Sequence, residues 1–360
     1  MPGGDEHQHA VGRRSYAHGA HRQKHGPVGK HRKGHRNHAQ QLPGRSEQGT
    51  LFTNGIMENA LYIDDLHVRS RFGCWIIRGG YAGLLTFPAM REPEYNDWPE
   101  EDGIEVDLSE PKLEDKEVAI PFLADSHVGA TDLVAYLSEP GYHSFYIPSL
   151  GRRWNLRLSS QSANRVYPLA TSFELKLVED VPVRPVPETM PDPGVWLAES
   201  RYLLDGVPFS AYGVATDDTR ASLLKSPTAK RNMDRTVSTE DGRIYDADHL
   251  VFQKKEVTFK CHFKAVSMEA FWKCYDAFFS ALIQPEERKL YVKEIGKEYL
   301  CYYKNTSGFK ILTMMGPVVV TFNLTLVFTM FRLYETDYFL ATESGDWIVT
   351  EDGEFFIDMK

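Results

Sequence analysis

The chain contains two copies of the same ordered series of residues, and this duplication constrains its fold more than any other feature. Four landmarks of the first series recur 140 positions later: Tyr62, Asp65, Ser70 and Gly73 return as Tyr202, Asp205, Ser210 and Gly213. Two triplets recur at an offset of 139: Glu101-Asp102-Gly103 as Glu240-Asp241-Gly242, and Lys116-Glu117-Val118 as Lys255-Glu256-Val257. The alternating run at 173–177 returns at 322–326, an offset of 149, which indicates ten inserted residues. A period this long exceeds that of solenoid repeats, so the pattern predicts two tandem versions of one domain.

Most of each copy reads as short strands separated by turn residues. Alternating, β-branched and aromatic-rich runs in the first copy predict strands at 61–68, 74–77, 103–108, 117–123, 154–158 and 172–178. We therefore expect a mainly β (α+β) fold, in which each copy is a β-sandwich or barrel with one flanking helix. The Lys-Glu-Val triplets are interpreted as strand starts, where exposed charge alternates with burial.

Each copy contains one helical pattern. In the first copy it covers 131–138, with Thr131 as the expected N-cap. In the second copy Ser267 is the expected cap, and Pro285 ends the pattern. Large apolar residues recur there at helical spacing: Phe271, Trp272, Tyr275, Phe278, Phe279 and Leu282. This stripe predicts a helix packed on a sheet, in preference to a cofactor site.

Five prolines between 181 and 194 favour an extended linker and mark the boundary between the copies. The predicted organisation is a leader at 1–56, a first β domain at 57–180, a linker at 181–200, a second β domain at 201–335 and a C-terminal β-hairpin extension at 336–360. In that extension the unit at 342–349 is repeated at 350–357. Two such strands are marginal alone, so they need another surface. The candidate assembly residues are Trp347, Phe355, Phe356 and Ile357.

The leader differs in composition from the rest of the chain. Residues 1–50 carry nine Lys or Arg and three acids, about +6, which leaves about −15 for the remainder. Eight of the thirteen histidines lie in the first 38 residues, where little is apolar, so disorder is expected. A metal or nucleic-acid tail is the functional alternative, since His31, His35 and His38 have helix-compatible ligand spacing. Another alternative is that translation begins at Met57.

Composition and spacing argue against several other classes. Four cysteines without a paired spacing predict buried thiols in a reducing compartment, with neither a disulfide framework nor a zinc site. The apolar stretch at 313–331 alternates with polar residues, which predicts a strand in preference to a membrane span. The N-terminus lacks the apolar run of a secretory signal. An acidic body is expected to repel nucleic acid.

No catalytic motif is recognised, so we expect no enzymatic activity, no cofactor and no metal. Glycosidase carboxylate pairs leave no signature, which makes Glu101, Asp102, Glu240 and Asp241 candidates. Their shared Glu-Asp-Gly context is more typical of a turn before a strand. The histidines beyond the leader have no ligand spacing: His67, His127, His143, His249 and His262.

With its tandem β domains, one helix each, and closing Thr-Glu units, the chain resembles structural proteins of tailed-phage tails over roughly 57–357. The resemblance is to a distal tail or baseplate component, or to a duplicated tail-tube subunit. It implies a tube-like β-sandwich fold, assembly into a ring and no catalysis. Expected partners are further copies in a trimer or hexamer, other tail or baseplate proteins, and DNA only in transit through a lumen. The expected location is the virion tail, assembled in the host cytoplasm, with no membrane contact.

Two other function classes stay open. β-Sandwiches bind glycans through aromatic side chains, which makes a carbohydrate-binding or adhesion module the main alternative. The available tryptophans are Trp75, Trp98, Trp154, Trp196 and Trp347. A cell-envelope hydrolase using a carboxylate pair is the third hypothesis, with Glu101 as the residue to test.

Overall fold

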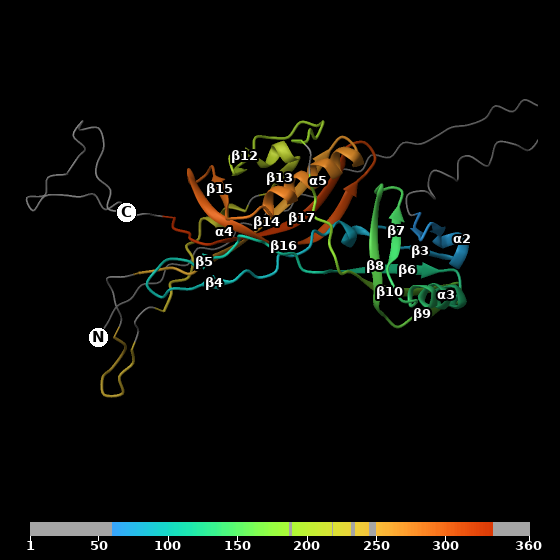
Figure 1. Cartoon of the computed structure of the whole chain (residues 1–360), viewed down its shortest axis with the longest axis horizontal. Helices are drawn as coiled ribbons and strands as arrows, with labels where there is room; N and C mark the ends of the chain where they lie inside the picture. The colour runs from blue at the N-terminus through green and yellow to red at the C-terminus, as the bar shows by residue number, and fades with distance from the viewer. Residues whose placement is uncertain (1–59, 187–188, 218, 232–234, 245–249, 334–360) are drawn as a thin grey trace, which may run out of the picture. The chain divides into compact units, whose positions relative to one another are not determined.

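The computed structural model describes residues 60–186, 189–217, 219–231, 235–244 and 250–333. In this part of the chain the fold is mostly β, with two curled half-barrel sheets and few helices, as predicted (Figure 1). The predicted leader, Met57 and the predicted C-terminal hairpin lie outside the described residues. The residue bounds proposed for the five segments stay predictions.

The first sheet is antiparallel and has the strand order β2-β1-β7-β8-β10-β6-β3, with β9 paired to β10. Its strands are β1 (Tyr62–Ile63), β2 (Leu66–His67), β3 (Cys74–Ile76), β6 (Lys116–Ala124), β7 (His143–Ile147), β8 (Arg152–Gln161), β9 (Arg165–Tyr167) and β10 (Ala170–Glu179). Its helices are α2 (Val68–Phe72), the 3-10 helix η2 (Ala82–Leu85) and α3 (His127–Leu137).

The second sheet is also antiparallel, with the order β12-β11-β15-β16-β17-β14-β13. Its strands are β11 (Tyr202–Leu204), β12 (Val207–Pro208), β13 (Val214–Thr216), β14 (Lys255–Ala265), β15 (Arg288–Val292), β16 (Lys297–Thr313) and β17 (Val318–Phe328). Its helices are the 3-10 helix η3 (Phe209–Tyr212), α4 (Arg220–Leu223) and α5 (Met268–Leu282). When elements are matched in chain order, the seven strands on the path of each sheet have the same neighbours. Both copies therefore follow one topology.

The additional residues of the second copy are distributed over three places. From Lys116 onward, structurally equivalent positions show the offset growing: 139 at Lys116 and Lys255, 141 at Ser126 and Ser267, 145 at Phe145 and Leu290, and 149 at Glu179 and Phe328. Strand β14 is longer than β6 by two residues, and α5 is longer than α3 by four. The last four lie where β16 continues beyond the length of β8.

Serine caps begin both long helices. Helix α5 starts after Ser267, whose side chain accepts a hydrogen bond from the Ala270 amide, as predicted. The aromatic stripe of α5 is buried except for half-buried Trp272, which confirms that it forms core. The predicted N-cap of α3, Thr131, was wrong. Ser126 is the cap, and Thr131 lies inside the helix, where its hydroxyl donates a hydrogen bond to the His127 carbonyl.

The start of each copy is a tight hairpin. The predicted single strand at 61–68 is instead β1 and β2, joined by Asp64 and Asp65, both at positive φ. In the second copy the two turn residues are Asp205 and Gly206. Asp205 is therefore the structural counterpart of Asp64, and not of Asp65, with which the sequence repeat aligns it. Both aspartates accept a backbone amide of the neighbouring strand, from Ser144 and Lys289.

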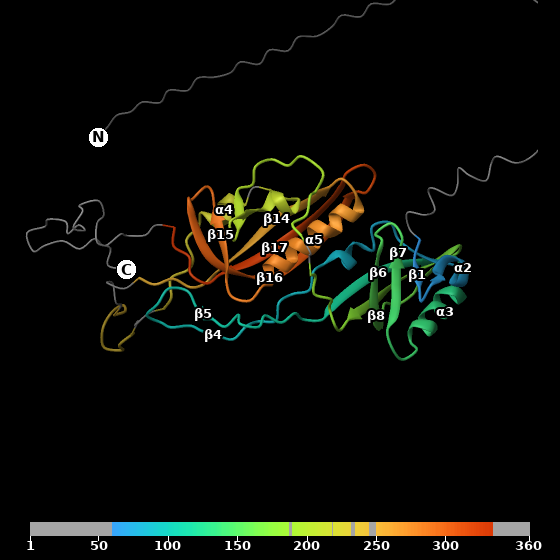
Figure 2. The ribbon, with the colours of Figure 1, turned by 45° about the horizontal axis from the view of Figure 1, so that its top comes forward.

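Each copy sends out a two-stranded arm between its short helix and its first long strand. Arm 1 (residues 86–114) includes β4 (Tyr95–Asn96) and β5 (Glu105–Val106) and runs beside the second sheet in both views (Figures 1 and 2). The described parts of arm 2 (225–231, 235–244 and 250–253) pair at the same relative positions. Two bridges of arm 1 recur at an offset of 139: Met90 with Leu113 as Ala229 with Phe252, and Asn96 with Glu105 as Arg235 with Ile244 at the tip. The arm is thus part of the repeated unit.

The described residues of 181–200 belong to no helix or strand, in keeping with the predicted extended linker. The alternating stretch that follows Thr313 forms strand β17, as predicted, with Phe322, Leu324 and Leu326 buried. Among the described helices, none has the length and apolar content needed to cross a membrane.

Candidate assembly site

The base of arm 1 packs against the second copy through one phenylalanine. Phe87 stacks on Phe279 of α5 with ring centroids 4.4 Å apart and planes at 5°. It also meets the edges of Tyr275 and Tyr303 at 6.2 and 5.7 Å. Stacked and edge-to-face arrangements of this kind both add to the free energy of burial. Phe87 is 3% exposed, so the arm supplies core to the other copy.

Backbone groups of the arm are bound by strand β16. The Phe87 amide donates to the Thr306 hydroxyl at 3.1 Å, and that hydroxyl donates to the Phe87 carbonyl at 3.0 Å. The Tyr303 hydroxyl donates to the Pro88 carbonyl at 2.9 Å, and the Met90 amide donates to the Lys304 carbonyl at 2.9 Å. These bonds satisfy main-chain groups that burial would otherwise leave unpaired. They fix the register of the arm on the strand.

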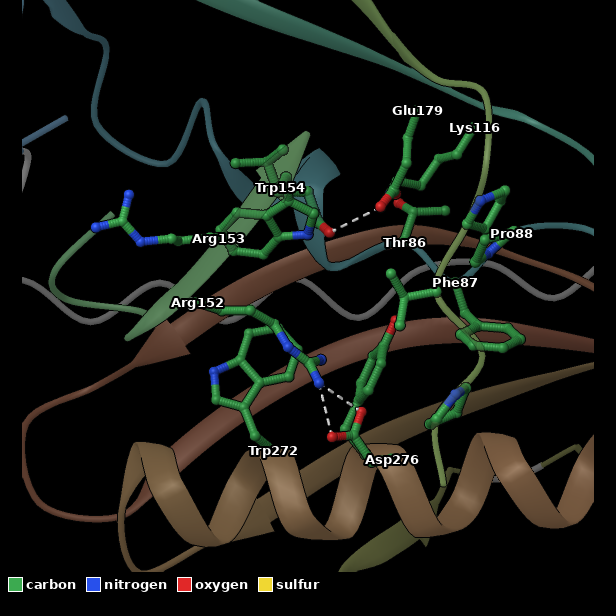
Figure 3. A pocket seen from close by; sticks show the side chains of 15 residues that line it. Thr86, Phe87, Pro88, Lys116, Arg152, Arg153, Trp154, Glu179, Trp272 and Asp276 are labelled. Atoms are coloured by element: carbon green, nitrogen blue, oxygen red, sulfur yellow. Dashed lines mark hydrogen bonds and ion pairs between the residues drawn. The ribbon is translucent and has the colours of Figure 1, made fainter. Parts of the chain in front are cut away.

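A pocket of about 160 Å³ lies beside this contact, between β8 and α5 (Figure 3). Arg152 donates to both Asp276 carboxylate oxygens at 2.9 and 2.7 Å and lies 4.1 Å from the centre of the Trp272 ring. The Trp272 indole donates to the Leu150 carbonyl at 2.6 Å. Both hydrogen bonds come from the Nη2 atom of Arg152, and a charged pair that also lies against an aromatic ring is a geometrically specific contact. It joins the first copy to α5 of the second.

A buried lysine anchors the root of each arm. Lys116 donates to the Leu84 carbonyl at 3.3 Å and forms a 2.7 Å ion pair with Glu179. Lys255 donates to the Leu223 carbonyl at 2.6 Å, which is the equivalent position. The Lys-Glu-Val triplets begin strands β6 and β14, as predicted, and charge alternates with burial there: the glutamates are exposed, while both lysines are buried. The reason is that each ammonium caps the last carbonyls of the short helix from which the arm departs.

Burial lowers the pKa of both lysines, because it penalises the charged form. For Lys116 the Glu179 carboxylate opposes this decrease in pKa. No carboxylate of the described residues does so at Lys255; its pKa falls to about 8, through burial first and the nearby Lys225 charge second. Its ammonium lies 3.7 Å from the centre of the Phe331 ring, a cation–π contact.

The far part of arm 1 is held by groups of the second copy. Asp102 accepts the Phe252 amide at 2.7 Å and pairs with Arg332. The Ile104 amide donates to the Thr329 carbonyl at 2.9 Å. A Cβ on Gly103 would lie 1.7 Å from that carbonyl oxygen, so only glycine allows this approach. The repeated Glu-Asp-Gly triplet is a turn in both copies, as predicted, and in the first copy that turn is a binding element.

The arrangement does not assemble the other candidate sites. Asp102 is engaged by an arginine and an amide, while Glu240 and Asp241 lie exposed in the turn of arm 2. His67 caps α2, His143 pairs with Asp64, and His249 lies outside the described residues. Among the residues described, no group of three or more His, Cys, Asp or Glu could hold a metal ion.

The four cysteines are free and buried, as expected. Burial raises the pKa of each thiol, to about 12 at Cys74 and about 11 at Cys274. Neutral thiols of this kind are poor nucleophiles and poor metal ligands.

The tryptophans of the glycan hypothesis lie in different environments. Trp154 is buried, 6.1 Å from Trp272, so it presents no free face to a sugar and that part of the hypothesis was wrong. Trp75 is half-buried, and Trp98 donates to Glu105 while 49% exposed. Trp196 is 81% exposed. The predicted assembly residues Trp347, Phe355, Phe356 and Ile357 lie outside the described residues, so their role stays a prediction.

Sequence reasoning missed the residues that join the copies. Arg152 and Asp276 are 124 positions apart and belong to no motif, so nothing in their spacing pairs them. The offset of 139 could have pointed to Phe87 and Met90, because it places them opposite Ser226 and Ala229 of the other arm, where the residues are smaller. Because the residue types differ at both positions, a comparison based on identical residues does not single them out.

No family model matches this chain, and no curated protein does. Among solved structures, the SPP1 Dit protein, described as a hub of the adsorption apparatus in phages that infect Gram-positive bacteria, is similar at 9% identity with a TM-score of 0.26. The match covers 74% of this chain and 97% of that chain. Agreement at this TM-score is too slight to support an argument.

Proposed function

We propose that this protein is a non-enzymatic structural subunit of a tailed-phage tail, which self-assembles into a ring at the distal end or baseplate and docks tube or fibre proteins. The observation that carries the proposal is the junction within the chain. Two copies of one topology meet there, and the arm of the first supplies core to the second. Equivalent units joined in this unsymmetrical way form a head-to-tail pair.

Head-to-tail contacts generate rings when the rotation between units closes. A chain that carries two units can complete a six-unit ring with three copies, so a trimer is expected. The edges of the sheets are short, since β2 and β12 have two residues each and β3 and β13 have three. Short edge strands discourage association through sheet edges. The arms, in contrast, extend beyond their own sheets and suit association better.

The remaining parts of the proposal follow from charge and place. The chain beyond residue 50 carries about −15, which suits a conduit whose wall must not retain DNA in transit. Assembly takes place in the host cytoplasm and the product is part of the virion. The predicted C-terminal hairpin is the segment proposed to dock neighbouring tail proteins.

Native mass spectrometry of the purified full chain tests this proposal. A closed trimer, or a hexamer built from it, is the expected species. A monomer that persists at high protein concentration would contradict ring formation.

Carbohydrate binding is the second candidate, favoured by the exposed indole of Trp196. A glycan array probed with the wild type and with Trp196→Ala and Trp98→Ala variants distinguishes it. Loss of glycan binding in these variants, with a monomeric protein, would favour an adhesion module over a ring subunit.

A further inference from the structure

The face of arm 1 that is buried at the junction has an open counterpart in arm 2. Four pairs of positions correspond at an offset of 139: Leu85 and Leu224, Phe87 and Ser226, Pro88 and Pro227, and Met90 and Ala229. All four residues of the first copy, Leu85 at the end of η2 and three in arm 1, are buried. Leu224 is 46% exposed, Ser226 is exposed, and the other two are half-buried. Arm 2 therefore exposes the surface that corresponds to the contact surface of arm 1.

The backbone of the two arms shows the same contrast. In arm 1 the hairpin is closed by the amides of Arg91 and Glu114, and the Met90 amide points outward to the Lys304 carbonyl. In arm 2 the equivalent amides, from Lys230 and Gln253, close the hairpin in the same way. None of the described residues accepts a hydrogen bond from the Ala229 amide. Ala229 thus carries an outward amide at the position of the Met90 donor.

The strand that receives arm 1 also has an open counterpart. Three receiving positions on β16 correspond to β8 at an offset of 145: Tyr303 to Leu158, Lys304 to Ser159, and Thr306 to Gln161. Tyr303 and Thr306 are buried under the arm, whereas Leu158 is half-buried and Gln161 is exposed.

The backbone position that accepts the hydrogen bond from the arm is a bulge residue in both copies. Lys304 and Ser159 are each the extra residue of a β-bulge, at the register shifts of β16 with β17 and of β8 with β10. A bulge leaves one residue out of the ladder, so its carbonyl is available to a further strand. Ser159 is exposed.

We propose that arm 2 of one chain docks on strand β8 of a second copy of this chain, with the Ala229 amide donating to the Ser159 carbonyl. This inference rests on the proposed ring function and names its interface. Arm 2 is bound to the tip of arm 1 of its own chain through Lys230 and Phe252, but its face at 224–229 is uncovered among the described residues. Within that part of the chain there is thus one uncovered arm face and one uncovered receiving strand, so the contact repeats from chain to chain in a single direction. The intrachain junction is the template for it. Since Ser226 replaces the stacking Phe87, the contact between chains is weaker than the junction and allows assembly from folded subunits.

Cysteine cross-linking tests the contact directly. Chains carrying Ala229→Cys are mixed with chains carrying Ser159→Cys and treated with a short bis-maleimide; the natural thiols are buried and unreactive. A covalent dimer of chains is expected on a denaturing gel. The matched negative control pairs Ala229→Cys with Val128→Cys, an exposed position on α3.

The outcomes separate this inference from the proposed function. A trimer in native mass spectrometry without the 229–159 cross-link overturns the docking and leaves the ring standing. A monomer at every concentration overturns the ring and the docking with it. Ala229→Pro supplies an independent test, because it removes the amide hydrogen while the hairpin bonds come from Lys230 and Gln253. With an unchanged circular dichroism spectrum, association should weaken at least ten-fold; unchanged association would refute the contact.

Discussion

Replacing Glu179 by glutamine is expected to destabilise the protein far more than an ordinary surface substitution. The Lys116–Glu179 pair has an N–O distance of 2.7 Å, and its side chains are 7% and 11% exposed. Two unit charges at this distance attract by about 6 kcal/mol at an effective dielectric constant of 20. The neutral amide would leave the ammonium buried without a counter-charge, and breaking such pairs costs about 3–5 kcal/mol. Because glutamine still offers an oxygen acceptor, we expect a loss of about 3 kcal/mol in unfolding free energy.

The matched control lies on the same pair of strands. Glu117 and Lys176 form a 3.2 Å pair between β6 and β10 with both side chains about half exposed, so Glu117→Gln should cost less than about 1 kcal/mol. Urea unfolding at fixed protein concentration measures both variants, and the m value should not change. Equal losses for Glu117→Gln and Glu179→Gln would refute the claim that the root of arm 1 depends on a buried charge pair.

Three further substitutions test other parts of the fold. Ser267→Ala removes the cap of α5 and should lower the unfolding free energy by about 1 kcal/mol in urea titrations; an unchanged midpoint would contradict the cap. Gly213→Ala places a Cβ at φ 72° and 3.1 Å from the Cys274 sulfur, so the melting temperature should fall by several degrees. For Lys255, with a folded pKa of about 8 against 10.5, the unfolded chain binds more protons between these values, so stability rises with pH there by at most about 3 kcal/mol. The difference between wild type and Lys255→Met measured at pH 7 and pH 10 isolates this effect from the buried thiols, and a difference independent of pH would refute it.

The duplication could be predicted from the sequence because several repeated letters are demanded by backbone geometry. Gly73 and Gly213 both end a short helix at positive φ, where other residues are strained. Strands β10 and β17 could likewise be predicted, because a strand with one covered face alternates buried and exposed side chains with a period of two.

Other parts could not be predicted, for identifiable physical reasons. The hairpin turn is Asp-Asp in the first copy and Asp-Gly in the second. The sequence repeat therefore aligns Asp65 with Asp205, whereas the backbone aligns Asp64 with Asp205. The cap at Ser126 was missed because Val128 and Gly129 are poor helix formers and concealed the first turn. The junction between the copies depends on contacts between distant residues, and only the three-dimensional arrangement brings these together.

The central claim is that the contact between the two copies within one chain recurs between chains and closes a ring. Electron microscopy of the purified full-length protein tests it most directly, through the symmetry of averaged particle images. We predict closed rings of three chains with six similar lobes. Isolated two-lobed particles at all concentrations would contradict the claim.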